Sequence, residues 1–328
     1  MYYTKDIVLI CDDNYFMPTT VCIKSIIENT KSIGDLSIIV CSFGLSKENI
    51  SFLESLGDKR IKVSAKIINE ECYAERIRMI SQKTHVTPAA LIKFELPSIF
   101  SELDRILYVD SDIVIKDNIQ ELLGTNIDNS YLAASYEFWD HIERISYSLN
   151  KKVSESFYFN SGVMLLNLKK MREDNVPELL WDYKLNRSKT PRMDQESFNA
   201  ICSKTAAHLS IKWNFNPAFR YRSYLNEINK VYHTNYSTIE QLEEDICVIH
   251  YVGTNDKPWL YETARMRSFW DDIFKVIYPS SKLKFKEPVL IKSGYLDSII
   301  EKIKEHGFYG LFCNVIYKIK SLKYERTN

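Results

Sequence analysis

The stretch that decides the fold is Arg105-Ile106-Leu107-Tyr108-Val109-Asp110-Ser111-Asp112, an apolar run that stops at two carboxylates. Its first five residues predict a buried strand, and a second apolar run, 113–115, follows directly. Open α/β sheets place their ligand sites at the carboxyl ends of strands. Two carboxylates one residue apart can reach one hard cation, Mg²⁺ or Mn²⁺, which favours oxygen ligands and substrate phosphates. Taken alone, the tripeptide is more often a solvated turn after a strand.

Strands and helices alternate on both sides of this stretch. Apolar runs predict strands at 6–11, 37–43, 62–68, 105–109, 132–135, 159–168 and 246–251. Helical spacing and proline starters predict helices at 19–29, 47–56, 87–94, 169–185, 194–202 and 295–304. This alternation predicts an α/β fold with a largely parallel sheet that is covered by helices on both faces.

Size and charge set the domain organisation. The chain has 328 residues, 45% of them hydrophobic, which suits one large domain with a small appendage. We expect one large domain over 1–278 and a basic, aromatic, helical segment over 279–328. The formal net charge is zero, so bulk charge gives no indication of nucleic-acid binding. Residues 282–328 nevertheless carry 10 Lys/Arg and 5 Asp/Glu, a net of +5, which leaves −5 for residues 1–281 and suggests contact with an anionic surface.

The cysteine pattern indicates a reducing compartment. The seven cysteines are an odd number without CxxC spacing, and most lie in apolar runs, so we expect buried free thiols. No signal peptide precedes the first strand, and no apolar run reaches the roughly 18 residues of a spanning helix. These observations predict a cytoplasmic protein.

Three further segments place polar residues at a strand end or a helix start. Residues 11–15 offer polar groups and a tyrosine ring to a nucleotide, or they form a helix-capping turn. Residues 159–163 interrupt an apolar strand with a glycine that permits close approach of a ligand, or they form an ordinary bulge. Residues 194–196 begin a helix with carboxylates, which a helix N-terminus also favours without a ligand.

A fourth segment, 250–259, combines His250, Gly253, Lys257 and Trp259 after an apolar strand. A histidine there can ligate a metal through a ring nitrogen, and a lysine can pair with phosphate. A lone histidine would more often be structural, but the four residues together at this spacing are much rarer by chance.

In their order along the chain, these segments resemble glycosyltransferase family 8, the retaining sugar-nucleotide transferases that include glycogenin and bacterial lipooligosaccharide galactosyltransferases. The resemblance covers about residues 5–260. It rests on Cys11-Asp12-Asp13-Asn14-Tyr15, Leu107-Tyr108-Val109-Asp110-Ser111-Asp112, Phe159-Asn160-Ser161-Gly162-Val163-Met164-Leu165-Leu166-Asn167-Leu168, Asp194-Gln195 and His250 to Trp259. It implies a GT-A type fold, a Rossmann-like mixed and mostly parallel sheet flanked by helices, with a small, mainly helical addition at the C-terminus.

The resemblance also implies the site. Asp110, Asp112 and His250 would hold Mn²⁺, with Mg²⁺ as the alternative, and the metal would bridge the diphosphate of a UDP-hexose. The residues implied in donor binding are Ile10, Asp12, Asn14, Tyr15, Lys93, Asp110, Ser111, Asp112, Ser161, Gly253 and Lys257. The residues implied at the reacting sugar are Asn160, Asp194 and Gln195.

This chain departs from the family pattern at three points. Lys93 stands where the family usually has arginine. Lysine keeps the positive charge but loses the forked hydrogen bonding of the guanidinium. The loop from Gly253 to Lys257 is one residue longer. Glu137 is the nearest carboxylate where the family often has an aspartate after the alanine-rich strand.

The function implied is retaining transfer of galactose or glucose from a UDP-sugar to a glycan, a lipid-linked acceptor or a glycoprotein. Front-face attack by the acceptor is favoured. A nucleotidyltransferase or an inverting transferase on a similar sheet, and a non-catalytic sugar-nucleotide-binding scaffold subunit, are the competing hypotheses. Residues 282–328 would contact the inner face of the membrane, or pack on the catalytic domain or a partner. An oligomer stays open.

Overall fold

Two sheets form the framework of the computed structural model, which describes residues 4–30, 34–81, 88–137, 158–186, 193–220, 224–253 and 255–287. The large sheet has seven strands in the order β3-β2-β1-β4-β7-β6-β8. These strands are β1 (Asp6–Ile10), β2 (Leu36–Ser42), β3 (Ile61–Ile67), β4 (Arg105–Val109), β6 (Leu132–Tyr136), β7 (Phe159–Asn167) and β8 (Ala207–Leu209). The small sheet pairs β5 (Ile113–Ile115) with β9 (Val248–His250).

The large sheet is mixed and mostly parallel, as the sequence predicted. Strands β3, β2, β1 and β4 are parallel neighbours, whereas β7 runs antiparallel to both β4 and β6. Strand β8 is parallel to β6. The antiparallel β7 enters the sheet beside the end of β4, and it therefore brings residues 160–162 next to Asp110.

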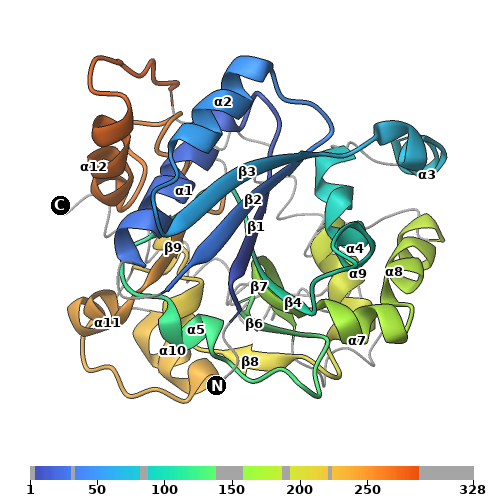
Figure 1. Cartoon of the computed structure of the whole chain (residues 1–328). Helices are drawn as coiled ribbons and strands as arrows, with labels where there is room; N and C mark the ends of the chain where they lie inside the picture. The colour runs from blue at the N-terminus through green and yellow to red at the C-terminus, as the bar shows by residue number, and fades with distance from the viewer. Residues whose placement is uncertain are drawn as a thin grey trace, which may run out of the picture.

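Helices cover both faces of the large sheet (Figure 1). One face carries α1 (Phe16–Asn29) and α2 (Lys47–Ser55), with α12 (Arg267–Ile277) packed outside α1. The other carries α4 (Pro88–Ile99), α7 (Leu168–Glu173), α8 (Val176–Leu185) and α9 (Met193–Cys202). The remaining elements are α3 (Ala74–Ser81), α5 (Gln120–Leu123), α10 (Leu225–Tyr232), α11 (Ile239–Asp245) and the 3-10 turns η1 (Glu70–Tyr73), η3 (Ile211–Trp213) and η4 (Pro217–Phe219).

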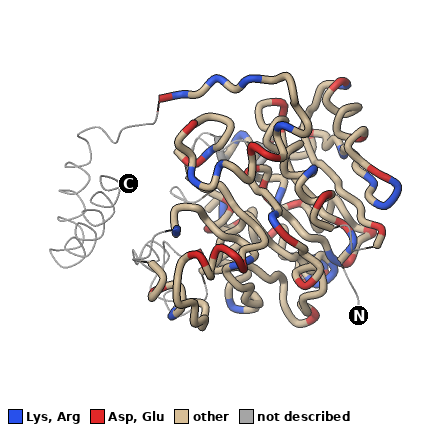
Figure 2. The backbone as a smooth tube through the Cα atoms, turned by 90° about the vertical axis from the view of Figure 1, so that its left-hand side faces the viewer, with Lys and Arg blue, Asp and Glu red and all other residues tan. Residues whose placement is uncertain are grey.

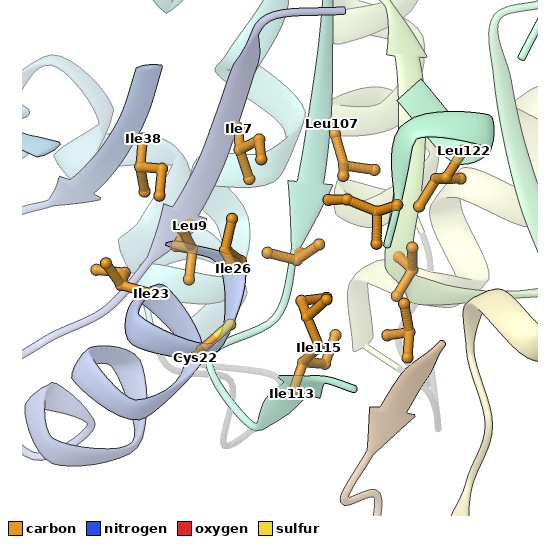
Figure 3. Close-up of a cluster of buried hydrophobic side chains, with 14 of the residues drawn as sticks. Ile7, Leu9, Cys22, Ile23, Ile26, Ile38, Leu107, Ile113, Ile115 and Leu122 are labelled. Carbon is orange, nitrogen blue, oxygen red and sulfur yellow. The ribbon is translucent and has the colours of Figure 1, made fainter. Parts of the chain in front are cut away.

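The period of two along the strands divides the core into two layers. In β1, Ile7 and Leu9 belong to the cluster under α1, whereas Val8 and Ile10 belong to the cluster under α4. Figure 3 shows the first cluster, in which Cys22, Ile23 and Ile26 of α1 lie against the sheet. Burying one aliphatic side chain of this size contributes about 1.5–3 kcal/mol. This packing fixes the strand ends that carry the polar segments.

Two helix predictions need correction. The helix predicted over 169–185 is two helices, α7 and α8, because Asn175 adopts a left-handed conformation with φ 52° and Pro177 then starts α8. The helix predicted to stop at Phe94 continues as α4 through Pro97 to Ile99. The helix predicted over 295–304 lies outside the described residues.

The cysteine prediction is confirmed for most of the described thiols. Cys11, Cys22, Cys41 and Cys202 are buried and free, but Cys72 is exposed and Cys247 half-buried, so burial is not general. Burial raises the pKa of Cys11 to about 11 and that of Cys41 to about 12. Both thiols are therefore protonated and unreactive at neutral pH.

The last described segment, 281–287, runs extended over the surface before the grey trace of Figure 2. Its lysines, Lys282, Lys284 and Lys286, are all exposed, and the Lys286 N–H donates to the Leu260 carbonyl at 2.7 Å. Within the described ranges, no helix combines the length and the apolar character that crossing a membrane requires.

Candidate active site

Strand pairing brings three distant segments together at the end of β4. The chain turns at Asp110 and Asp112 and continues into β5, whose Ile113 pairs with His250 of β9. The Tyr251 N–H donates to the Asp112 carbonyl at 3.0 Å, and on the other side the Asp110 N–H donates to the Gly162 carbonyl at 2.8 Å. Backbone hydrogen bonds on both sides therefore position the two carboxylates.

Asp110, Asp112 and His250 form a cluster that can hold a metal ion. The Nε2 atom of His250 lies 3.2 Å from an Asp112 carboxylate oxygen and 3.8 Å from one of Asp110. One ligand atom from each residue lies within 4.8 Å of the others. Two carboxylates and an imidazole are a donor set that suits Mn²⁺ or a similar divalent cation.

Gly162 leaves the space that this cluster occupies. A Cβ atom at residue 162 would lie 2.2 Å from Cε1 of His250 and 2.9 Å from Oδ2 of Asp110. These distances are too short for any real contact. The glycine of the 159–163 segment is thus required by the close approach of the two predicted ligands.

Lys93 of α4 neutralises the interior of the site. Its ammonium lies 2.9 Å from Asp110 and 2.9 Å from Asp194, and only 6% of the residue is exposed. Burial would lower the pKa of Lys93, but the two carboxylates outweigh burial and raise it, so the ammonium stays charged. The hydroxyl of Tyr108 donates to the same Asp110 oxygen at 2.5 Å, and burial first, then Asp110, raises the pKa of Tyr108.

Lys257 neutralises the outer carboxylate. Its ammonium pairs with Asp112 and donates to the Tyr251 carbonyl at 2.7 Å. Burial would lower the pKa of Lys257, and Asp112 overcomes this and raises it. Burial would raise the pKa of Asp112, but Lys257 and then His250 hold it well below its usual range. Asp112 is therefore ionised and ready to bind a cation at neutral pH.

The loop after β9 connects this lysine to the segment after β1. Gly253 turns the chain with φ 98°, in the left-handed region that favours glycine. The ring of Trp259 lies 5.7 Å from the Lys257 ammonium and edge-on to the ring of Tyr15 at 6.0 Å. Tyr15 is 42% exposed, so it presents an open aromatic surface beside the lysine.

Asp12 and Asn14 lie in the turn that leads into α1. The N–H of Tyr15 donates to the Asp12 carboxylate at 2.9 Å, and the Asn14 amide reaches the same carboxylate at 3.5 Å. Ser111 donates to the Ile10 carbonyl at 2.9 Å, which ties the end of β1 to the carboxylate turn. Asp12 therefore accepts a hydrogen bond within the turn, but no side chain caps α1, whose N-cap residue is Tyr15.

The remaining predicted residues form a buried polar network on the other side of Asp110. The Ser161 hydroxyl donates to Asp194 at 3.0 Å, and the Ser161 backbone N–H donates to the side-chain oxygen Oε1 of Gln195 at 3.3 Å. Asn160 donates to Glu137 at 2.9 Å and to Gln195 at 3.2 Å, and Gln195 donates to Glu137 at 3.2 Å. Glu137, named above only as the nearest carboxylate, is thus an integral part of the site.

Sequence reasoning missed Asn214, which connects this network to His250. Its Oδ1 lies 2.8 Å from Nδ1 of His250, and its Nδ2 donates to the Asn160 side chain at 2.9 Å. Its one signal in the sequence is the alternation Trp213-Asn214-Phe215-Asn216, which sets polar residues between buried rings.

Comparison with known proteins agrees with these motifs. The family model described as Glycosyl transferase family 8 matches residues 6–263, a range that holds every residue of the site. A lipopolysaccharide 1,2-glucosyltransferase of Escherichia coli is 28% identical over 324 residues, which span 91% of this chain and 89% of that protein. A lipopolysaccharide 1,3-galactosyltransferase of Salmonella typhimurium is 28% identical over 195 residues, 56% of this chain and 53% of that protein.

Solved structures share the fold. The galactosyltransferase LgtC, solved with donor and acceptor sugar analogs, superposes with a TM-score of 0.65 at 22% identity, over 89% of this chain and 99% of that one. The bifunctional glycosyltransferase WbbM superposes with a TM-score of 0.68 at 20% identity, over 85% of this chain and 52% of that one. On the strength of the family match, the chain belongs to glycosyl transferase family 8.

Proposed function

We propose that this glycosyltransferase is a retaining, Mn²⁺-dependent enzyme that transfers galactose or glucose from a UDP-sugar. The observation that carries the proposal is the convergence of Asp110, Asp112 and His250 at the end of β4, with ligand atoms within 4.8 Å of one another. Lysines flank the cluster on both sides and keep the carboxylates ionised, and together with a bound divalent cation they would give the site the positive charge that suits an anionic diphosphate.

In this proposal, Asp110, Asp112 and His250 hold Mn²⁺, with Mg²⁺ as the alternative. When bound, the metal offsets the negative charge that develops on the departing diphosphate. Gly162 supports the assignment, since any side chain there would displace two of the three ligands.

The donor nucleotide would lie over Tyr15, Trp259 and Lys257, which come together where the loop after β9 meets the start of α1. The exposed ring of Tyr15 offers a stacking surface to the uracil base, and Asp12 and Asn14 offer polar groups to the ribose. Ile10 and Ser111 shape the floor of this pocket, where the Ser111 hydroxyl meets the Ile10 carbonyl. Lys257 and the backbone of Gly253 would hold the phosphates.

The transferred hexose would face Asn160, Ser161, Asp194 and Gln195. Asp194 receives hydrogen bonds from Lys93 and Ser161 at one oxygen, Oδ2, so its carboxylate is held in one orientation and the ammonium weakens it as a nucleophile. This supports front-face attack. The acceptor oxygen forms a bond to the anomeric carbon on the face from which UDP leaves, and its proton passes to the departing β-phosphate. The Gln195 carbonyl oxygen would stabilise the cationic sugar.

The acceptor class follows from the relatives and from charge. The relatives from Escherichia coli and Salmonella typhimurium are named as lipopolysaccharide glycosyltransferases. Their names support a lipid-linked or other surface glycan as the acceptor of this chain. The exposed Lys282, Lys284 and Lys286 begin the basic segment 282–328, which would bind the anionic inner face of the membrane as an accessory to the domain 1–278.

The test is release of UDP from UDP-glucose and UDP-galactose in the presence of Mn²⁺, Mg²⁺ or EDTA. We expect metal-dependent release from one of these donors, and loss of release in Asp112→Asn. Asp117→Asn is the matched control, because Asp117 is an exposed aspartate that follows the same short strand β5. Release that is unaffected by EDTA would contradict the metal assignment, and absence of release from any UDP-hexose would contradict the donor.

A further inference from the structure

Asn214 lies between the metal cluster and the sugar-side network, and it contacts both. It is 7% exposed and lies just after η3, in the loop whose Phe215 pairs with Ile249 of β9. Its side chain has two polar ends, one toward His250 at 2.8 Å and one toward Asn160 at 2.9 Å. The consequence of this bridge depends on which end is the oxygen.

Backbone groups fix the polarity of the bridge. The Gly162 N–H lies 2.9 Å from the Asn160 side chain and can only donate, so the Asn160 atom there is Oδ1. An oxygen cannot donate, so the Asn214 atom that faces it is Nδ2. The other end of Asn214, which faces His250, is therefore Oδ1. The Ser161 N–H fixes Gln195 in the same way, and the Glu137 carboxylate accepts from the amide groups of both Asn160 and Gln195.

The oxygen of Asn214 determines the tautomer of His250. Because this oxygen accepts, Nδ1 of His250 carries the hydrogen, and Nε2 is the nitrogen left to ligate a metal. Nε2 is also the atom that lies 3.2 Å from Asp112. With a metal bound, the ring would present Nε2 to it and keep an N–H at Nδ1, toward Asn214.

We propose that Asn214 is a positioning residue that fixes the tautomer and orientation of the metal ligand His250, and couples it to the sugar-side amides through Asn160. This inference rests on the proposed function, since it assigns His250 as a metal ligand. It adds a residue that does not itself touch the metal and predicts two separable effects, one at each end of the Asn214 side chain.

The experiment titrates MnCl₂ alone into the protein and follows free Mn²⁺ by electron paramagnetic resonance, with electron spin echo detection of ¹⁴N coupling from a bound imidazole. Asn214→Leu removes both hydrogen bonds, and we expect the Mn²⁺ Kd to rise about 10–100-fold, with loss of the ¹⁴N coupling. Asn214→Asp keeps an oxygen opposite Nδ1 but no donor for Asn160. We expect it to keep the ¹⁴N coupling and a Kd within about threefold of the wild type or tighter, while kcat for donor turnover falls.

Asn167→Leu is the matched control. Asn167 is 8% exposed, and its side chain bonds to Ile127 and Lys170 at the far end of β7, so its loss should leave Mn²⁺ binding unchanged. If Asn214→Leu keeps both the wild-type Kd and the ¹⁴N coupling, the inference fails and the proposed function stands. If Asn214→Leu does not fold, a folded Asn214→Asp that loses the ¹⁴N coupling overturns the inference. If the wild type binds no Mn²⁺, both fail.

Discussion

Gly162→Ala is the substitution that tests the geometry of the metal cluster most sharply. It adds one methyl group and removes no ligand, charge or hydrogen bond. The new Cβ would lie 2.2 Å from Cε1 of His250, whereas ordinary contact begins at 3.4 Å, so one of the two must move by about 1.2 Å. The new Cβ would also lie 2.9 Å from Oδ2 of Asp110, so it cannot avoid His250 by moving toward Asp110.

A displacement of this size is large for a site that acts by position. A misplacement of about 1 Å costs on the order of 10²-fold in rate, and disturbed metal ligands lose about 10–100-fold in affinity. We therefore expect Gly162→Ala to raise the Mn²⁺ Kd by about 10–100-fold and to lower kcat/KM for donor turnover by about 10²-fold or more.

The assay is Mn²⁺ titration together with UDP release at saturating metal, so that weak metal binding and poor geometry are separated. Gly44→Ala is the control, because a Cβ there meets nothing within 4 Å. Gly162→Ala with the Mn²⁺ affinity and turnover of the wild type would refute the assignment of His250 and Asp110 as neighbouring ligands.

Three further changes probe the charges of the site. Lys93→Met leaves the buried Asp194 and the half-buried Asp110 without their cation, and should lower the free energy of unfolding in urea by about 3–5 kcal/mol. Lys93→Arg should retain most of that stability, and equal stability of Lys93→Met and the wild type would contradict the pairing of Lys93 with these carboxylates. The pKa of Asp112 is lowered in the folded protein, so the stabilisation by this carboxylate is present above the unfolded pKa of about 3.9 and is lost as the pH falls toward the folded pKa. The stability difference between the wild type and Asp112→Asn should therefore shrink from pH 7 to pH 3. A constant difference would contradict the lowered pKa of Asp112. Asp194→Asn should lower donor turnover at least about 10-fold with Mn²⁺ affinity unchanged, and near-normal turnover would remove Asp194 from its assigned role.

The sequence predicted the large sheet well because its strands are long apolar runs. Strands β1 and β4 are almost entirely apolar and buried, as expected in a sheet that is covered on both faces. The three-residue β8 and the seven-residue α11 give too little periodicity to be recognised. Asn175 and Pro177 mark the break between α7 and α8 in the sequence, because asparagine tolerates the left-handed conformation and proline fits only the first turn of a helix.

The candidate site could be predicted only as far as each residue's own chemistry reaches. Carboxylates at the end of β4 and a histidine at the end of β9 indicate a ligand site. Whether they come together depends on the pairing of β5 with β9, which no local sequence pattern specifies. The family resemblance predicted that Lys93 contributes to binding of the donor sugar nucleotide. Its burial between Asp110 and Asp194 depends on how α4 crosses the sheet, and the same holds for the bridge formed by Asn214.

The central claim is that Asp110, Asp112 and His250 bind one divalent cation that receives the diphosphate of a UDP-sugar. The most direct test is a crystal structure of the protein with Mn²⁺ and UDP, with anomalous scattering measured to locate manganese. The account predicts one manganese peak within about 2–2.5 Å of oxygens of both carboxylates and of Nε2 of His250, shared with phosphate oxygens. Manganese bound elsewhere, or UDP ordered in the site without it, would contradict the account.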